Sequence, residues 1–290
     1  MPDQRPARQR LLLDVDTGID DAVALMYLLA TPGVSVEAIT CTAGNVGARQ
    51  VALNNLALLE LCGHAGVEVA IGSEVPLEIP LVTTEETHGD QGIGYAELPP
   101  PRGHISGRHA VDVWLEAVRC HPGQITGVVT GPLTNLALAI RAEPQLPMLL
   151  KGLVIMGGAF NYPGNTTPVA EWNTHVDPHA AKEVYAAYEG LPEEKLPIVC
   201  ALETTERIEC TPAHVDAVAR AAGPGRRCSN RTDPRAHAAA AATPSSPACP
   251  TPSGSTWSST GSTTRGTWRT CTISSPSWSR RVRPPSRSGS

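Results

Sequence analysis

The chain has 290 residues, of which 41% are hydrophobic and 18% are charged, and its formal net charge is −5. A chain of this length can bury one large hydrophobic core or two small ones. No apolar run approaches the roughly 18–20 residues that a membrane helix needs. Residues 1–10 are polar and the apolar run Leu11–Leu13 is too short for a signal peptide. Eight cysteines are scattered without CxxC or zinc-finger spacing, which argues against zinc sites and disulfide frameworks. We therefore expect no membrane segment and a reducing, cytoplasmic location.

Residues 228–290 differ sharply in composition from residues 1–227. They contain 15 Ser, 10 Thr, 8 Pro and 8 Arg, but a single acid (Asp233) and neither Lys nor Leu. So few aliphatic side chains cannot build a core. The segment fits a disordered appendage, a tether to nucleic acid or a surface, or translation of a shifted reading frame. We favour the last because the change is abrupt, and we place the boundary of the folded domain at residue 227.

Short apolar runs alternate with amphipathic stretches along residues 1–227. In chain order the pattern predicts a strand over 10–16, a helix over 20–30, a strand over 34–41, a helix over 49–62, a strand over 67–71, a long connection over 72–107, a helix over 109–121, a strand over 124–130, a helix over 133–142, a strand over 153–156, a helix over 177–188, a strand over 198–202 and a helix over 211–222. The connection is too long for a plain turn, so we expect it to be functional or mobile.

Alternating strands and helices predict an α/β fold with an open, mainly parallel sheet covered by helices on both faces. In such sheets, ligands bind outside the carboxyl ends of the strands. Candidate functional residues should therefore lie directly after strands.

Four carboxylates, Asp14, Asp16, Asp20 and Asp21, follow one another at the end of the first strand. They repel one another unless a cation or protonation relieves them. A helix cap explains Asp20 or Asp21, but not Asp14 and Asp16 at the end of an apolar strand. Carboxylate oxygens without nearby His or Cys favour Ca²⁺ or Mg²⁺ over zinc, and Gly18 permits a tight turn around one ion. A helix–loop–helix calcium loop is disfavoured because a strand precedes these acids.

Other predicted strand ends add polar groups. Gly44 and Asn45 follow the second strand, and Thr130, whose carbonyl could face the same ion, ends the fourth. After Met156, a loop carries polar and aromatic side chains that suit the vicinal hydroxyls of a sugar: Asn161, Asn165, Glu171, Trp172 and Asn173.

Six motifs carry a more specific resemblance. They are DVDTGIDDAVAL (14–25), TAGN (42–45), HGDQGIG (88–94), TGPLTNLA (130–137), MGGAF (156–160) and NTTPVAEWNTHVDP (165–178). In this order and spacing, residues from about 10 to 227 resemble the inosine–uridine-preferring nucleoside hydrolase family. The resemblance implies a Rossmann-like open fold with one Ca²⁺ at the sheet edge, which holds both the ribose hydroxyls and the attacking water.

The resemblance also implies roles for individual residues. Asp16, Asp21 and the carbonyl of Thr130 would bind the metal, and Asp16 would also be the general base toward the attacking water. His88 would cover the ribose from a mobile loop. The residues expected to contact the ribose are Asp20, Asn45, Met156, Asn165, Glu171 and Asn173. The implied substrate is a small nucleoside, whose N-glycosidic bond is cleaved through an oxocarbenium-like sugar. The resemblance also implies a homodimer or homotetramer.

The chain departs from the family near its C-terminal end. The family supplies a further metal ligand from a late His-Asp pair, whereas this chain has no such dipeptide after residue 227. Asp233, preceded by Thr, is the nearest candidate. The segment that would carry an acid for the leaving base is not recognisable. A catalytically impaired nucleoside- or ribose-binding relative is therefore the alternative to an active hydrolase.

Two other classes of protein fit less well. A haloacid-dehalogenase-like phosphatase also has Asp-x-Asp after a strand, but it has Thr or Val where Gly18 stands and no use for the Asp20–Asp21 pair. Nucleic-acid binding has only the arginines after residue 227 in its favour, because residues 1–227 are acidic. We expect no nucleic-acid partner.

Overall fold

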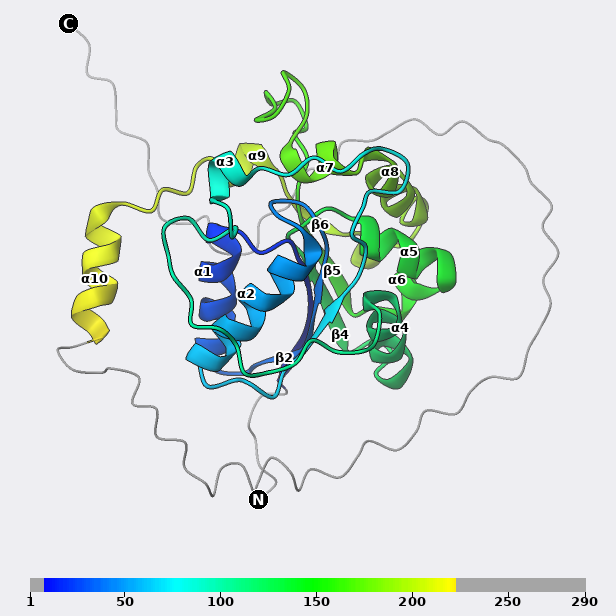
Figure 1. Ribbon diagram of the computed structural model, residues 1–290. Coiled ribbons are helices and arrows are strands. Elements are labelled where there is room, and N and C mark those ends of the chain that lie inside the picture. The colour runs from blue at the N-terminus through cyan, green and yellow to red at the C-terminus, as the bar shows by residue number, and fades with distance from the viewer. Residues whose placement is uncertain (1–7, 223–290) are drawn as a thin grey trace, which may run out of the picture. The chain divides into compact units, whose positions relative to one another are not determined.

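Six strands form one open sheet in the order β3-β2-β1-β4-β5-β6, and every neighbouring pair is parallel. The computed structural model describes residues 8–222 (Figure 1). The strands are β1 (Gln9–Val15), β2 (Val34–Cys41), β3 (Glu68–Ile71), β4 (Ile125–Val129), β5 (Gly152–Met156) and β6 (Ile198–Cys200). The predicted open parallel sheet is confirmed. The strand order changes direction at β1 and β4, which is where ligands bind in sheets of this kind.

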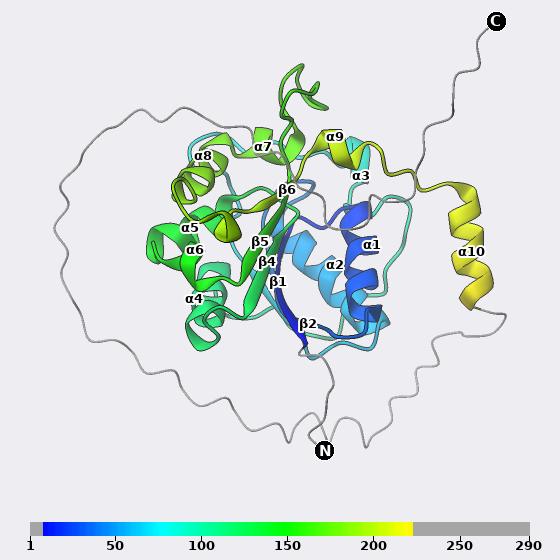
Figure 2. The same ribbon diagram turned by 180° about the vertical axis from the view of Figure 1, so that it is seen from behind.

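Helices cover both faces of the sheet (Figures 1 and 2). One face carries α1 (Ile19–Ala30) and α2 (Ala48–Leu61); the other carries α4 (Ala110–Cys120), α5 (Thr134–Ala142), α6 (Leu146–Leu149) and α8 (Pro178–Ala187). Side chains of β1 alternate between two hydrophobic cores. Leu11 and Leu13 belong to the core under α1 and α2, and Leu12 belongs to the core under α4 and α5.

The predicted longer helices and the strands agree with the structure to within a few residues. The helices that the sequence did not predict are short: α3 (Glu85–His88), α6, α7 (Trp172–Val176), α9 (Leu202–Thr205) and the 3₁₀ turn η1 (Glu193–Lys195). They have three to five residues each, too few for helical periodicity to show. The last helix within residues 8–222, α10 (Pro212–Ala222), begins at the predicted proline.

Within residues 8–222, no helix is long and apolar enough to cross a membrane. The expectation about residues 228–290 concerns a segment outside the described residues.

Trp114 of α4 is the largest fully buried side chain. It packs over Gly127 of β4, where an added Cβ would lie 2.8 Å from the indole ring. The absence of a side chain at this strand position therefore makes room for the indole.

We expect Trp114→Ala to lower the free energy of unfolding by about 3–5 kcal/mol, because it leaves a large cavity in the core. Val23→Ala on the outer surface of α1, where the side chain is 60% exposed, should change it by less than about 0.5 kcal/mol. Urea denaturation of both variants measures the difference. Equal effects would contradict this account of the core.

Candidate functional site

The loops that follow β1, β2 and β4 meet at the carboxyl edge of the sheet. The backbone N–H of Thr42 donates to the carbonyl of Val15 at 3.0 Å, and that of Thr130 donates to the carbonyl of Asp14 at 2.9 Å. The segments after β2 and β4 therefore flank the end of β1. The structure thus brings together three of the strand ends at which the sequence predicted functional residues.

Asp16 lies at the centre of this edge and is only 1% exposed. One carboxylate oxygen accepts a hydrogen bond from the backbone N–H of Asn45 at 2.9 Å, and the other has no hydrogen-bond partner. A Cβ at Gly44 would overlap with this carboxylate, so the close approach of the β2 loop requires glycine. Burial, together with the nearby charge of Asp21, raises the pKa of Asp16 well above its usual value.

Asp21 lies in the first turn of α1 and is 6% exposed. Its carboxylate accepts from the backbone N–H of Gly18 at 2.9 Å, which holds the β1–α1 turn closed. Burial and the charge of neighbouring Asp20 raise the pKa of Asp21 to about 6. Asp20 itself is exposed. Two of the predicted acids are thus buried together, and the third faces solvent beside them.

Asp14 is also fully buried, and side chains of β2 and α5 hold its carboxylate. One of its oxygens accepts from the hydroxyl of Thr40 at 2.9 Å and from the side-chain amide of Asn135 at 2.9 Å. Burial raises the pKa of Asp14 to about 7, although these two hydrogen bonds oppose the shift. Asn135 also accepts from the backbone N–H of Ser73, so it joins β1 to the start of the long connection.

Several buried oxygens at this edge lack hydrogen-bond partners within the described chain. They are Asp14 Oδ2, Asp16 Oδ1 and Asn45 Oδ1. Buried acceptors without donors are costly, and carboxylate and amide oxygens are ligands that Ca²⁺ and Mg²⁺ prefer. These donor atoms fit a hard cation.

The described residues supply fewer charged ligands than a metal site usually has. Among residues 8–222, no group of three or more His, Cys, Asp and Glu side chains is arranged to hold a metal ion. Asp16 and Asp21 supply two carboxylates, so the remaining ligands would be backbone or amide oxygens, bound molecules or residues from elsewhere in the chain. Asp233, the further ligand suggested by sequence, lies outside the described residues.

Asn173 connects two neighbouring strand ends. Its side-chain amide donates to the carbonyl of Thr130 at 2.6 Å and lies 3.2 Å from the carbonyl oxygen of Met156. The structure therefore brings together three residues that the sequence predicted at one site. Because one lone pair of the Thr130 carbonyl is engaged by Asn173, its second lone pair is the one open to another partner.

Glu171 serves as the cap of α7 and is 1% exposed. Its carboxylate accepts from the backbone N–H groups of Gly158, Asn173 and Thr174 at 2.9–3.0 Å. The sequence predicted a ribose contact here, and that role stays a prediction. The structure adds that this carboxylate fixes the loop on which Asn173 stands.

His88 and Asn165 lie on segments that extend over or beyond the sheet edge. His88 Nδ1 accepts from the backbone N–H of Ile19 at 3.3 Å, and a Cβ at Gly18 would collide with its ring. The His88 segment therefore rests on the β1–α1 turn. Asn165 is exposed, in the segment between β5 and α7 that stands out from the body of the molecule (Figure 1), and its side chain accepts from the hydroxyl of Thr166.

Sequence reasoning missed Asp177 as a connecting residue. It is fully buried, and its carboxylate accepts from the backbone N–H of Leu77, the hydroxyl of Thr134 and the backbone N–H of Ala180 at 2.8–2.9 Å. It thus joins the long connection, α5 and α8. The Asp-Pro pair at 177–178 signals a helix start, but its distant partners are visible only in the tertiary structure.

A parallel α/β domain with buried aspartates at the carboxyl edge of its central strand is a familiar class of small-ligand enzyme scaffold. The sequence pattern of the family described as inosine-uridine preferring nucleoside hydrolase matches residues 11–251. The chain belongs to this family. The match extends past residue 227, at which the motifs of the sequence had placed the end of the resemblance.

Similar proteins include Uridine nucleosidase 1 of Arabidopsis thaliana, 40% identical over 181 residues (62% of this chain and 54% of the relative). The inosine-uridine preferring nucleoside hydrolase of Leishmania major is 38% identical over 179 residues (61% and 57%). Among solved structures, a plant nucleoside hydrolase has a TM-score of 0.67 at 30% identity, covering 73% of this chain and 65% of that one. The chain thus spans little more than half the length of these two curated relatives.

We expect Asp177→Ala to destabilise the domain by about 3 kcal/mol or more, because it leaves three donors unpaired, of which two are buried and one is partly buried. Glu183 lies on α8, the helix that Asp177 begins, and forms a surface ion pair with Arg141 of α5. Glu183→Ala removes this pair and should lower the free energy of unfolding by less than about 1 kcal/mol. Chemical denaturation compares the two variants. A small effect of Asp177→Ala would show that the three segments do not depend on this carboxylate.

Proposed function

We propose that this chain hydrolyses the N-glycosidic bond of ribonucleosides, releasing the free base and ribose. The observation that carries the proposal is the buried pair Asp16 and Asp21, with an unpartnered Asp16 oxygen at the carboxyl edge of β1. Membership of the nucleoside hydrolase family supports the same reaction.

Asp16, Asp21 and the carbonyl of Thr130 would hold the cation, which we propose to be Ca²⁺ on the basis of the family resemblance. When bound, such an ion lowers the pKa of a water molecule and fixes its position. Asp16 would accept a proton from the attacking water through the oxygen that no hydrogen bond occupies. Its other oxygen stays with the Asn45 N–H, which fixes the orientation of the carboxylate.

The sugar would lie between the ends of β1, β2 and β5. Asp20, exposed beside the buried acids, and the amide of Asn45 would bind ribose hydroxyls, as would Asn173. Cleavage leaves positive charge on the sugar, and the carboxylates of Asp16 and Asp20 would stabilise it. Met156, Glu171 and Asn165 complete the proposed sugar contacts, and His88 would cover the site.

The alternative is a protein that binds nucleoside or ribose without turnover. Departure of the base is easier when an acid protonates it. The region where the family's late His-Asp pair would lie is outside the described residues. Binding needs the strand-end residues alone, whereas turnover of natural nucleosides also needs help for the leaving base, so the two functions can be separated by substrate.

The test of the proposed function is hydrolysis of p-nitrophenyl riboside beside inosine and uridine, with Ca²⁺ present. The nitrophenolate leaves without protonation, so this substrate reports on the cation and Asp16 alone. We expect turnover of p-nitrophenyl riboside by the full chain. Failure on all three substrates, from protein shown to be folded by circular dichroism, would favour the binding-only alternative.

We expect Ca²⁺ to stabilise the wild-type chain by about 2–3 kcal/mol at a concentration about 100-fold above its Kd. Asp21→Ala should abolish this stabilisation, because it removes one of the two carboxylates proposed to bind the cation. Asp112→Ala, an exposed acid in the first turn of α4, should keep it. Thermal unfolding with and without Ca²⁺ measures the effect, and an unchanged response of Asp21→Ala would refute the assignment of the metal site.

A further inference from the structure

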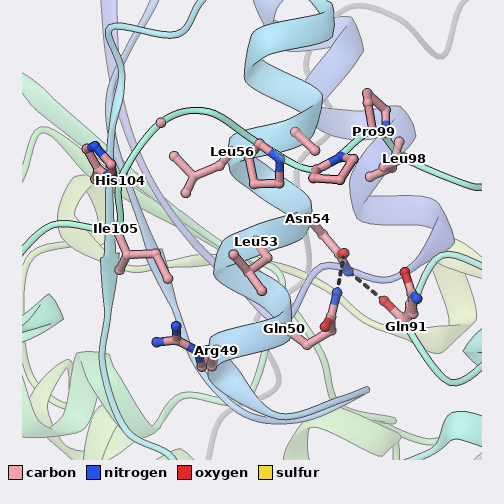
Figure 3. A pocket seen from close by; sticks show the side chains of 14 residues that line it. Arg49, Gln50, Leu53, Asn54, Leu56, Gln91, Leu98, Pro99, His104 and Ile105 are labelled. Carbon is pink, nitrogen blue, oxygen red and sulfur yellow. Dashed lines mark hydrogen bonds between the residues drawn. The ribbon is translucent and has the colours of Figure 1, made fainter.

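Two consecutive asparagines of α2, Asn54 and Asn55, are almost fully buried, at 3% and 1% exposure. Buried amides in a helix need partners outside the helical hydrogen-bond ladder. The side-chain amide of Asn54 donates to the carbonyl of Gln91 at 2.6 Å and accepts from the side chain of Gln50 at 2.9 Å (Figure 3). The amide of Asn55 donates to the hydroxyl of Thr17 at 2.7 Å.

The two asparagines therefore hold two different loops of the candidate site. Gln91 lies three residues after His88, in the segment that rests on the β1–α1 turn. Thr17 follows Asp16 directly, in the turn that leads to Asp21. One helix thus fixes the covering segment and the acidic turn through neighbouring side chains.

The rest of the long connection shows why the bond to Gln91 matters. Upstream, the backbone N–H of Thr84 donates to the carbonyl of Asn45 at 3.0 Å. Downstream, Glu60 of α2 accepts from the backbone N–H groups of Arg102 and Gly103, both at 2.6 Å.

Between the attachments to Asn54 and Glu60, a cavity of about 720 Å³ separates α2 from the chain at 98–105 (Figure 3). Residues of α2 such as Leu53 and Leu56 form one wall, and Leu98 and Ile105 form part of the other. This cavity contains none of the predicted site residues. Leu98 and Ile105 pack against the core under α1 and α2, whereas at Gln91 the side chain of α2 that holds the connection is Asn54.

We propose that Asn54 is a positioning residue that holds the His88 segment over the site, and that Asn55 does the same for the Asp16–Asp21 turn. The inference deepens the proposed function and rests on it for the roles of His88 and the acids. Neither asparagine contacts the proposed substrate; each acts through the loop that it holds.

The experiment is hydrogen exchange on the full chain with a matched pair of near-isosteric variants, Asn54→Leu and Asn55→Leu. In Asn54→Leu, the amides of Gly92 and Gly94, which bond to the Gly89 and His88 carbonyls, should exchange about tenfold faster, while the amide of Gly18 keeps its protection. In Asn55→Leu, the amide of Gly18 should exchange about tenfold faster, while the amides of Gly92 and Gly94 keep their protection. Gln50→Leu leaves the Asn54–Gln91 hydrogen bond in place, so it should change the exchange of neither the Gly92 and Gly94 amides nor the Gly18 amide.

A ligand readout separates positioning from mere stability. Asn54→Leu should weaken D-ribose binding about tenfold while leaving the Ca²⁺-dependent rise in Tm unchanged, and Asn55→Leu should reduce that rise. Asn54→Asp, which keeps the acceptor for Gln50 and loses the donor to Gln91, serves if the leucine variant does not fold.

Unchanged exchange at Gly92 and Gly94, or faster exchange throughout the domain, would overturn the proposal. If the wild-type chain neither binds ribose nor cleaves ribosides, the proposed function fails, yet the exchange pattern still decides whether Asn54 holds the segment.

Discussion

The site depends on the cost of burying several carboxylates at the end of one central strand. Asp14, Asp16 and Asp21 lie within eight residues of one another, and all are almost fully removed from solvent. Such charges can stay buried only where donors or a cation compensate them. The Asn45 N–H, the Asn135 amide and the turn at Gly18 supply part of this compensation, and the oxygens left over are where a cation fits.

This constraint sets the positions of the surrounding loops. Gly44 lets the β2 loop approach the Asp16 carboxylate, and Gly18 leaves room for the ring of His88. Asn135 and Asp177 reach from the β4 side of the sheet to the long connection, while α2 holds the same connection from the other side. The long connection, which carries the covering segment, is therefore attached to both halves of the domain.

The family match covers most of this chain, whereas the chain covers little more than half of its curated relatives. The family pattern reaches residue 251, yet the chain covers only 54–57% of the Arabidopsis and Leishmania relatives. Similar proteins include both a uridine nucleosidase and a purine-preferring ribonucleoside hydrolase from Gardnerella vaginalis. These two names differ in the base preferred, so family membership alone assigns no base to this chain.

The sequence by itself determined the longer helices, the strands and the family, and it predicted the edge of the sheet at which a site should lie. Apolar runs alternating with amphipathic stretches predicted the parallel sheet, and acids directly after the first strand predicted its functional edge, because periodicity and strand ends are local properties. Tertiary structure alone decided that Glu171 caps α7, that Asp177 joins three segments, and that Asn54 and Asn55 hold separate loops. A buried polar side chain takes its role from its partner, and here those partners stand up to 100 residues away in the chain.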